Sequence, residues 1–259
     1  MENRITNLFQ NKKKGILSIY FTAGYPGLND TITTIKALED AGVDMVEIGI
    51  PFSDPIADGP VIQHSSEVAL KNGMNLKLLF EQLIHIRNTV KIPLLLMGYL
   101  NPVLQFGVKK FCKQCSIVGI DGIIIPDLPL TDYLQEYKDV FEAFNLSNIF
   151  LITPQTSKDR INLIDKNTNG FIYMVAMDST TGRTSGINAK QVAYFDKIKK
   201  MKLRNPTVTG FGIYNNTTFK KALRYANGAI IGSAFIKAIN NSGNLENDII
   251  KFVKAINLN

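Results

Sequence analysis

The sequence predicts an α/β fold: a single (β/α)8 TIM barrel over residues 1–259, with an extra N-terminal helix. The length of 259 residues suits one barrel of this kind or two small domains. Short β-branched runs alternate with amphipathic helical patterns from end to end, without a linker or low-complexity segment between them. Eight such strand runs, each followed by a helical pattern, are typical of a closed parallel barrel, and a doubly wound open sheet is the alternative.

In chain order, the segment ENRITNLFQN (2–11) is expected to form the extra helix, which closes the bottom of the barrel. Amphipathic helices are predicted over 30–42 and 76–88, where apolar residues recur at three- and four-residue spacing. In a barrel of this class, catalytic residues lie at the carboxyl ends of strands and in the loops that follow them. The eight predicted strands cover residues 16–21, 44–49, 93–98, 122–127, 149–153, 171–176, 206–211 and 228–233.

The composition is that of a soluble globular protein, with 45% hydrophobic and 20% charged residues. The net charge of +7, from 29 Lys and Arg against 22 Asp and Glu, raises the question of an anionic partner. The basic clusters fall on separate predicted helices or termini, which argues against a nucleic-acid partner and favours a solvated outer ring. These clusters are Lys12 to Lys14, Lys109 and Lys110, Lys199 and Lys200, and Lys220 and Lys221.

The N-terminal sequence MENRITNLFQNKKKG lacks the apolar core of a signal peptide. The sequence has no charge-free stretch of about 20 apolar residues that would span a bilayer. We therefore expect a cytoplasmic protein without a membrane partner.

Neither the cysteines nor the histidines predict a metal site. Cys112 and Cys115, the two cysteines of the chain, lie in FCKQC within a predicted helix, and the sequence has no second Cys or His pair to complete a zinc site. His64 and His85 have no acidic or Cys partner at ligand or triad spacing.

Glu47 interrupts the apolar strand DMVEIG (44–49). Side chains alternate along a strand, so Met45 and Glu47 point one way while Val46 and Ile48 point the other. The aliphatic pair must meet the outer helices, which places Glu47 in the barrel interior. Burial there raises the pKa of a carboxyl group and suits it to proton transfer near neutral pH. The alternative is a carboxylate neutralised by a Lys or Arg from a neighbouring strand.

The loop after this strand carries two further acids, Asp54 and Asp58, in SDPIADGP (53–60). Its prolines and glycine exclude a continuous helix and enforce turns. A loop folded over the barrel mouth would return Asp58 to the cavity that holds Glu47. Two carboxylates in unlike environments can divide acid and base roles. Loop acids that only confer solubility are the alternative.

Glycines directly follow the seventh and eighth predicted strands, in VTGFGI (208–213) and IIGSAF (230–235). Without a Cβ, backbone N–H groups can approach an anion, and Ser233 is placed to cap a helix N-terminus. Loops after strands seven and eight bind phosphate in many barrels of this class. The pattern therefore predicts a small phosphorylated substrate, with simple turns as the alternative role of these glycines.

The loop after the sixth strand, MDSTTGRTSGINAK (177–190), is long and rich in small residues, which fits an active-site lid. Gly182 and Gly186 are candidate hinges, and Arg183 is a candidate phosphate contact. A disordered insertion with a free surface Arg is the alternative.

The chain resembles the tryptophan synthase alpha chain family. The run VEIGIPFSDPIADGPVIQ (46–63) is similar to the signature segment of that family nearly throughout. Similarity extends over essentially the whole chain, in FTAGYP (21–26), MGYLNP (97–102), GIDGIIIPDLP (119–129), GFIYMV (170–175), TTG (180–182), TGFGI (209–213) and IGSA (231–234).

The resemblance implies a lyase that cleaves indole-3-glycerol phosphate by a retro-aldol reaction to indole and glyceraldehyde 3-phosphate, with neither metal nor organic cofactor. Glu47 matches the inward acid and base, which shuttles protons at indole C3 and the glycerol hydroxyl. Asp58 matches the loop acid that stabilises positive charge on the indole nitrogen. Family members pass indole through a tunnel to a beta chain in an α2β2 heterotetramer.

The same matching assigns further positions. Tyr20 falls on an indole-pocket position. Substrate and phosphate positions fall on Tyr173, Thr181, Gly182, Phe211, Gly212, Gly232 and Ser233. Contacts with the beta chain fall on Asp54, Pro55, Asn101 and Pro129.

Two features depart from the family pattern. Tyr20 stands where Phe is common and adds a hydroxyl to an apolar pocket. Ser179 stands at a position that is usually glycine, and Asp178 adds negative charge near the phosphate site. Two other functions are the alternatives: another phosphate-binding barrel that acts as an isomerase or epimerase, and a non-catalytic subunit that activates a partner. The second would have no use for an inward acid that costs stability.

Overall fold

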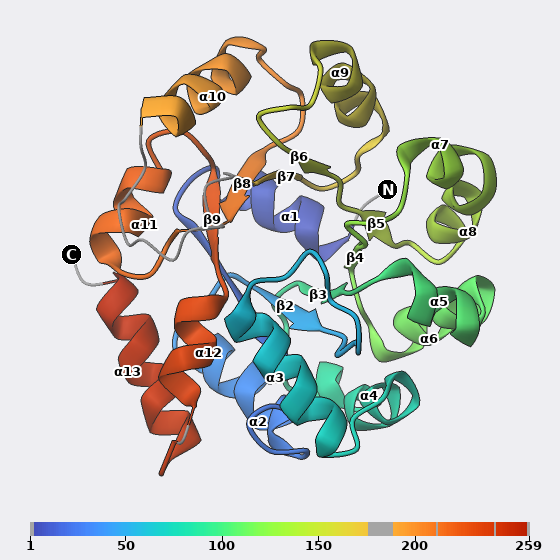
Figure 1. Cartoon of the computed structure of the whole chain (residues 1–259), viewed down its shortest axis with the longest axis vertical. Coiled ribbons are helices and arrows are strands. Elements are labelled where there is room, and N and C mark those ends of the chain that lie inside the picture. Colours follow the sequence, from blue (N-terminus) through green and yellow to red (C-terminus); the bar gives the residue numbers. More distant parts are fainter. Residues whose placement is uncertain (1–2, 176–188, 211, 241, 258–259) are drawn as a thin grey trace.

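The computed structural model describes residues 3–175, 189–210, 212–240 and 242–257. A curled, all-parallel sheet lies at its centre and helices surround it (Figure 1). The sheet order is β5-β4-β3-β2-β1-β9-β8-β7-β6, so neighbouring strands follow one another along the chain and β1 pairs with β9. A doubly wound sheet would reverse its order part-way, and this sheet does not. The strands are β1 (Ile16–Thr22), β2 (Met45–Gly49), β3 (Leu94–Met97), β4 (Gly122–Ile124), β5 (Ser147–Asn148), β6 (Leu151–Ile152), β7 (Ile172–Val175), β8 (Thr207–Gly210) and β9 (Gly228–Ile231).

The fifth barrel strand is interrupted, which is why nine short strands form an eight-stranded barrel. Its first part, β5, pairs with β4, and its second part, β6, pairs with β7. Between them the Ile149 N–H donates to the Ile123 carbonyl (2.9 Å), and the Phe150 carbonyl accepts from the Tyr173 N–H (3.0 Å). Residues 147–152 thus join the two edges of the sheet. The predicted (β/α)8 class is confirmed, although the fifth strand begins two residues earlier than expected.

Helices cover the outside of the barrel (Figure 1). The predicted helix 30–42 is α2 (Asp30–Asp40), whereas the predicted helix 76–88 divides into α4 (Leu76–Leu83) and the 3-10 turn η1 (Ile86–Asn88). The tighter turn lets Arg87 donate to the carbonyls of Val90 and Ile92, at 3.2 and 2.7 Å. The other helices are α3 (Pro60–Lys71), α5 (Leu100–Phe106), α6 (Val108–Val118), α7 (Leu130–Asp132), the π-helical turn η2 (Tyr133–Tyr137), α8 (Lys138–Ala143), α9 (Lys158–Asn167), α10 (Ala189–Lys200), α11 (Asn216–Ala222), α12 (Ser233–Ile239) and α13 (Leu245–Asn257).

The extra helix is α1 (Arg4–Asn11), and it lies against the amino-terminal end of the barrel. Its capping residue Asn3 donates to the Asp121 carbonyl (3.0 Å) and to the Ser147 hydroxyl (2.9 Å). Its buried Ile5 side chain fills the space that a side chain at Gly122 would otherwise occupy. Helix α1 therefore closes the bottom of the barrel, as expected, and leaves the opposite end for chemistry.

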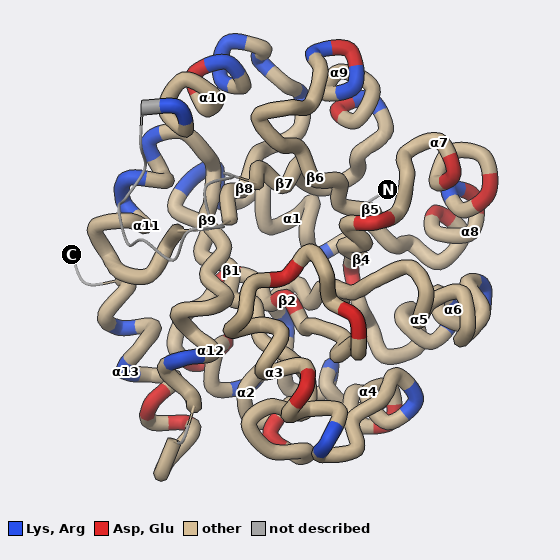
Figure 2. The backbone as a smooth tube through the Cα atoms, in the orientation of Figure 1, with Lys and Arg blue, Asp and Glu red and all other residues tan. Residues whose placement is uncertain are grey.

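None of the helices in the described part of the chain combines the length and apolar character that a membrane span requires. Charge is spread unevenly over the surface: Lys and Arg gather over α10 and α11, α9 carries both signs, and Asp and Glu are prominent around β2, α3 and α7 (Figure 2). Basic residues also lie on α4, α6, α12 and α13, so positive charge is not confined to one side of the barrel.

Candidate active site

Glu47 lies inside the barrel on β2, and its side chain is completely buried. Its Oε1 accepts a hydrogen bond of 2.9 Å from the hydroxyl of Ser18 on β1. Its Oε2 has no hydrogen-bond partner among the described residues, and no ion pair with Lys or Arg forms there. Burial raises the pKa of Glu47 to about 8, although the Ser18 hydrogen bond opposes this shift. The carboxyl group can therefore give and take a proton near neutral pH.

Two tyrosines share the interior with Glu47. Tyr20 on β1 is in register with Glu47, and Tyr173 reaches in from β7. A Cβ at Gly49 would collide with the Tyr20 hydroxyl, and a Cβ at Gly210 would collide with the Tyr173 hydroxyl. Glycine at these two strand ends therefore makes room for both phenols, a packing role that the sequence did not reveal.

Asp58 reaches this interior from the loop between β2 and α3. Its Oδ2 accepts a 3.1 Å hydrogen bond from the hydroxyl of Tyr99, and the same hydroxyl accepts one from the Ala57 N–H, also at 3.1 Å. The Asp58 N–H donates to the Pro55 carbonyl (3.0 Å), which closes a turn. Burial raises the pKa of Asp58, and the Tyr99 hydrogen bond opposes the shift. Tyr99 lies two residues after the end of β3 and so fixes the loop to the barrel rim.

The charges of Glu47 and Asp58 both affect the pKa values of Tyr20 and Tyr173. Burial, followed by the charges of Asp58 and Glu47, raises the pKa of Tyr20. Burial, followed by the charges of Glu47 and, more weakly, Asp58, raises the pKa of Tyr173. The two carboxyl groups therefore lie near the same two phenols in the barrel interior, between β1, β2, β7 and the loop. Both phenols stay protonated at neutral pH and can donate hydrogen bonds within it.

The loops after β8 and β9 lie next to the two phenols. A Cβ at Gly232 would lie 3.2 Å from Cδ1 of Tyr20, so Gly232 borders the interior. Gly212 is exposed with a φ of +73°, a conformation that favours glycine. Ser233 does not cap α12 as expected: Gly232 is the N-cap, and Ser233 is the first residue of the helix. The first helical hydrogen bond runs from the Ile236 N–H to the Gly232 carbonyl (3.0 Å), so earlier N–H groups of the first turn face outward along the axis.

The predicted partner-contact residues lie at the same rim. Asp54 and Pro55 are in the Asp58 loop, Asn101 is the second residue of α5, and Pro129 precedes α7. The Asp127 carboxylate accepts hydrogen bonds of 2.9 and 3.2 Å from the Leu100 N–H, which ties the loop before α7 to the start of α5. Asp54, Asn101 and Pro129 are exposed, and Ile56 at the loop tip is 91% exposed.

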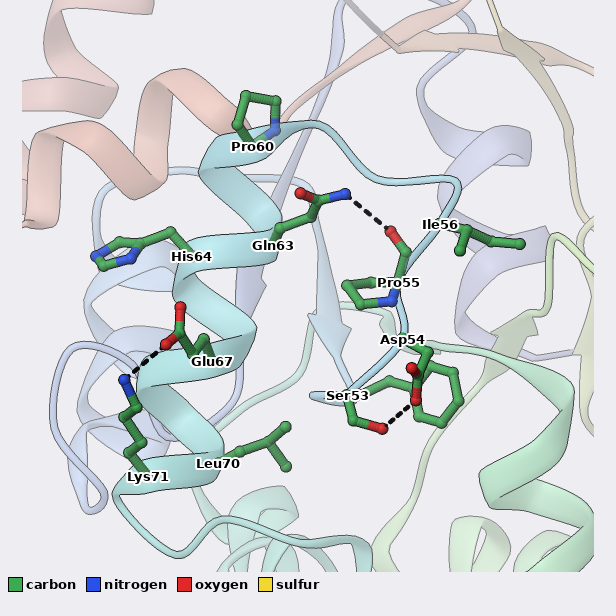
Figure 3. A pocket seen from close by; sticks show the side chains of 11 residues that line it. Ser53, Asp54, Pro55, Ile56, Pro60, Gln63, His64, Glu67, Leu70 and Lys71 are labelled. Atoms are coloured by element: carbon green, nitrogen blue, oxygen red, sulfur yellow. Dashed lines mark hydrogen bonds and ion pairs between the residues drawn. The ribbon is translucent and has the colours of Figure 1, made fainter.

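A groove of about 630 Å³ lies between α3 and residues 52–56 of the loop that carries Asp58. Gln63 crosses its upper end and donates to the Pro55 carbonyl at 3.3 Å (Figure 3). Neither Glu47 nor Asp58 lines this groove. It is therefore separate from the part of the barrel interior where the two acids lie.

Comparison with known proteins decides the family. The family model described as "Tryptophan synthase alpha chain" matches residues 6–258. The chain belongs to the tryptophan synthase alpha chain family. The alpha chain of Flavobacterium psychrophilum is 58% identical over 98% of this chain and 99% of that relative, and the alpha chain of Flavobacterium johnsoniae is 59% identical over 93% and 95%. The crystal structure of the Legionella pneumophila alpha chain superposes with a TM-score of 0.88 at 30% identity, over 99% and 96% of the two chains.

As a member of this family, the chain is a lyase. It cleaves indole-3-glycerol phosphate to indole and glyceraldehyde 3-phosphate in tryptophan biosynthesis. Alpha chains of this family form a complex with the beta chain, and a structure of tryptophan synthase from M. tuberculosis superposes on this chain with a TM-score of 0.86 at 25% identity, over 98% of both chains.

Part of the expected alpha-chain site lies outside the described residues. This part comprises Thr181, Gly182 and Phe211, and also Asp178, Ser179, Arg183 and Gly186 of the expected lid. The last two residues of that expected lid (177–190), Ala189 and Lys190, begin α10 instead. The ends of two predicted strands, residues 176 and 211, lie outside the described residues too.

Sequence reasoning missed two residues of the site, Ser18 and Tyr99. Ser18 is a polar residue inside an apolar strand, and Tyr99 follows the carboxyl end of β3 within MGYLNP. Both positions carried a usable signal, because polar groups at the barrel interior and at carboxyl strand ends are the usual catalytic positions of this fold.

Within the part of the chain that the structure describes, no group of three His, Cys, Asp or Glu is arranged to hold a metal ion. Cys112 and Cys115 are free and buried in α6. Burial raises the pKa of Cys112 to about 12 and that of Cys115 well above its ordinary value, so neither thiol ionises readily at neutral pH.

Proposed function

We propose that Glu47 and Asp58 carry the proton transfers and charge stabilisation of the lyase reaction. Glu47, protonated below about pH 8, donates its proton through Oε2 to indole C3. The positive charge that then develops on the indole nitrogen is stabilised by the Asp58 carboxylate. The Glu47 carboxylate next accepts the proton of the glycerol hydroxyl, an aldehyde forms, and the bond to indole C3 breaks with its electrons returning to the ring. The observation that carries this proposal is the buried, unpaired Oε2 of Glu47 beside two phenols.

We propose that the substrate spans the cavity, with indole near Tyr20 and Tyr173 and phosphate at the loops after β8 and β9. Gly212, Gly232 and Ser233 would present backbone N–H groups and a hydroxyl to the phosphate, together with Thr181, Gly182 and Phe211. The exposed position of Ser233 and the first turn of α12 support this placement. The chemistry would need neither a metal nor an organic cofactor, so chelator-treated protein should keep full activity.

The rim residues Asp54, Pro55, Asn101 and Pro129 are proposed to contact the beta chain in a cytoplasmic α2β2 complex. Their shared position at one end of the barrel supports this assignment. Indole would leave the cavity at this end.

The test measures indole release from indole-3-glycerol phosphate by the purified chain, alone and with a beta chain. We expect slow release that the beta chain accelerates. Glu47→Gln should abolish turnover with little loss of substrate binding, Asp58→Asn should reduce it strongly, and Ser233→Ala should mainly raise KM. A wild-type rate in either acid variant would remove that residue from the mechanism. No release by folded wild-type protein in either condition would leave a subunit that only activates its partner.

A further inference from the structure

Ser18 is a buried polar residue within the apolar strand β1. The strand register pairs Ser18 with Met45 and Tyr20 with Glu47. The Ser18 hydroxyl therefore reaches diagonally across to the next inward residue of β2 and donates to Oε1 of Glu47 at 2.9 Å. A buried hydroxyl without a hydrogen-bond partner destabilises a fold, and Glu47 supplies the acceptor for this one.

The hydrogen bond makes the two carboxyl oxygens of Glu47 unequal. Oε1 is held by Ser18, whereas Oε2 is buried and has no partner among the residues described here. We propose that Ser18 is a positioning residue of the lyase reaction: it fixes the Glu47 carboxyl group so that Oε2 is the oxygen that delivers and accepts the proton. This inference rests on the proposed role of Glu47 as acid and base.

Ser18 also affects the ionisation of Glu47. A hydrogen bond donated to a carboxylate favours its charged form and opposes the effect of burial. Loss of the Ser18 hydroxyl therefore raises the pKa of Glu47 further, in addition to releasing the side chain. If Glu47 starts the reaction protonated, activity falls as pH rises through that pKa, and the basic limb of the pH profile reports it. The substrate phosphate titrates near pH 6 and affects the acidic limb instead.

The experiment compares Ser18→Ala, Ser18→Cys and Ser18→Thr in the complex with the beta chain. Ala removes the hydroxyl, Cys keeps the size with only a weak donor, and Thr keeps the hydroxyl. We measure kcat and KM for indole-3-glycerol phosphate between pH 6.5 and 9.5. In the Ala and Cys variants kcat should fall about tenfold, KM should stay within about twofold, and the basic limb should move to higher pH. The Thr variant should return the limb to its wild-type position and restore most of kcat.

Ser65→Ala is the matched control. Ser65 is also completely buried and lies against β1, but its hydroxyl pairs with Thr22 at 2.7 Å and not with Glu47. Its kcat and basic limb should match the wild type, and circular dichroism should verify that each variant is folded.

The outcomes separate this inference from the proposed function. If Glu47→Gln is inactive while Ser18→Ala and Ser18→Cys keep the wild-type kcat and basic limb, Ser18 only fills space and the inference is wrong. If Glu47→Gln keeps its activity, the proposed role of Glu47 fails first. If the Ala variant does not fold, the size-matched Cys and Thr variants decide the question, and equal behaviour of these two would overturn the role of the hydroxyl.

Discussion

The carboxyl group of Glu47 is completely buried, so its contribution to the stability of the folded protein depends on pH. In the unfolded chain its carboxyl group ionises near 4.5, whereas in the folded protein burial holds the proton until about pH 8. Between these two pH values the unfolded chain has lost a proton that the folded protein keeps, so the free energy of unfolding falls progressively as pH rises. Below pH 4.5 the carboxyl group is protonated in both states, and this residue costs no stability.

Glu47→Gln removes this penalty because the amide never ionises. The variant should match the wild type near pH 4.5 and gain stability with rising pH, on the order of 5 kcal/mol above pH 8. Urea unfolding of both proteins between pH 4.5 and 8.5 measures the difference. Glu67→Gln is the control: Lys71 holds the pKa of that exposed carboxyl below its usual range, so the variant should not gain stability with pH. A pH-independent effect at Glu47 would contradict its raised pKa.

Tyr99 supports Asp58 from the neighbouring strand end, at 3.1 Å. Tyr99→Phe removes the hydrogen bond, which raises the pKa of Asp58 and releases the loop. We expect kcat to fall about tenfold, as for loss of a hydrogen bond to a charged group. In an Asp58→Asn background the same change should have little further effect on kcat, because the carboxylate through which Tyr99 acts is already absent. Tyr194→Phe, which loses a buried hydroxyl bonded to the Ile152 carbonyl, should keep the wild-type kcat.

The strands and the helices expected over 2–11 and 30–42 followed from local pattern, whereas the contacts that complete the site did not. Alternation along 44–49 was sufficient to place Glu47 inside the barrel, because one face of that strand is entirely aliphatic. The return of Asp58 to the cavity depends on Tyr99, which is 41 residues away in the sequence. The interruption of the fifth strand depends on pairing with both β4 and β7. Long-range partners of this kind leave no periodic signal in one sequence.

The η1 turn illustrates how one element acts on its neighbours. Its Arg87 forms a 2.6 Å ion pair with the buried carboxylate of Asp121, which also accepts from the Leu94 N–H at 3.0 Å. Arg4 of α1 contributes a second, half-exposed ion pair at 3.0 Å. Burial lowers the pKa of Arg87 to about 10, so the side chain remains charged at neutral pH. This cluster joins α1, η1 and the start of β3 at the bottom of the barrel, far from the catalytic rim.

Arg87→Met should therefore destabilise the protein without altering its chemistry. Removing one partner of a buried pair leaves Asp121 with a single, half-exposed cation, and we expect a loss of about 3 kcal/mol in urea unfolding. The kcat of the folded fraction should be unchanged. Lys71→Met breaks an exposed pair of the same 2.6 Å length on α3 and should leave stability unchanged within error. Equal stability of the two variants would show that burial does not matter here.

The charges of the whole molecule are divided between its two halves. Residues 151–259 contain 16 Lys and Arg against 6 Asp and Glu, whereas residues 1–150 contain 13 against 16. The proposed phosphate loops belong to the basic half, and the acids Asp54 and Asp58 belong to the other. Among the basic helices, α9 and α10 form a groove of about 700 Å³ that Lys158, Lys197 and Lys200 line. Such a field raises the local concentration of an anionic substrate.

Reversing charge on the basic half should therefore weaken capture of the phosphorylated substrate. For Lys197→Glu with Lys200→Glu we expect KM to rise about twofold at low salt with kcat unchanged, because these side chains act through the field and not at the reacting atoms. The difference from the wild type should disappear above about 0.5 M salt, where screening shortens the range of charges to a few ångströms. Lys109→Glu with Lys113→Glu on α6 makes the same change of net charge on the acidic half and should leave KM nearly unaltered. Equal shifts in both double variants would mean that net charge alone, and not its distribution, governs substrate capture.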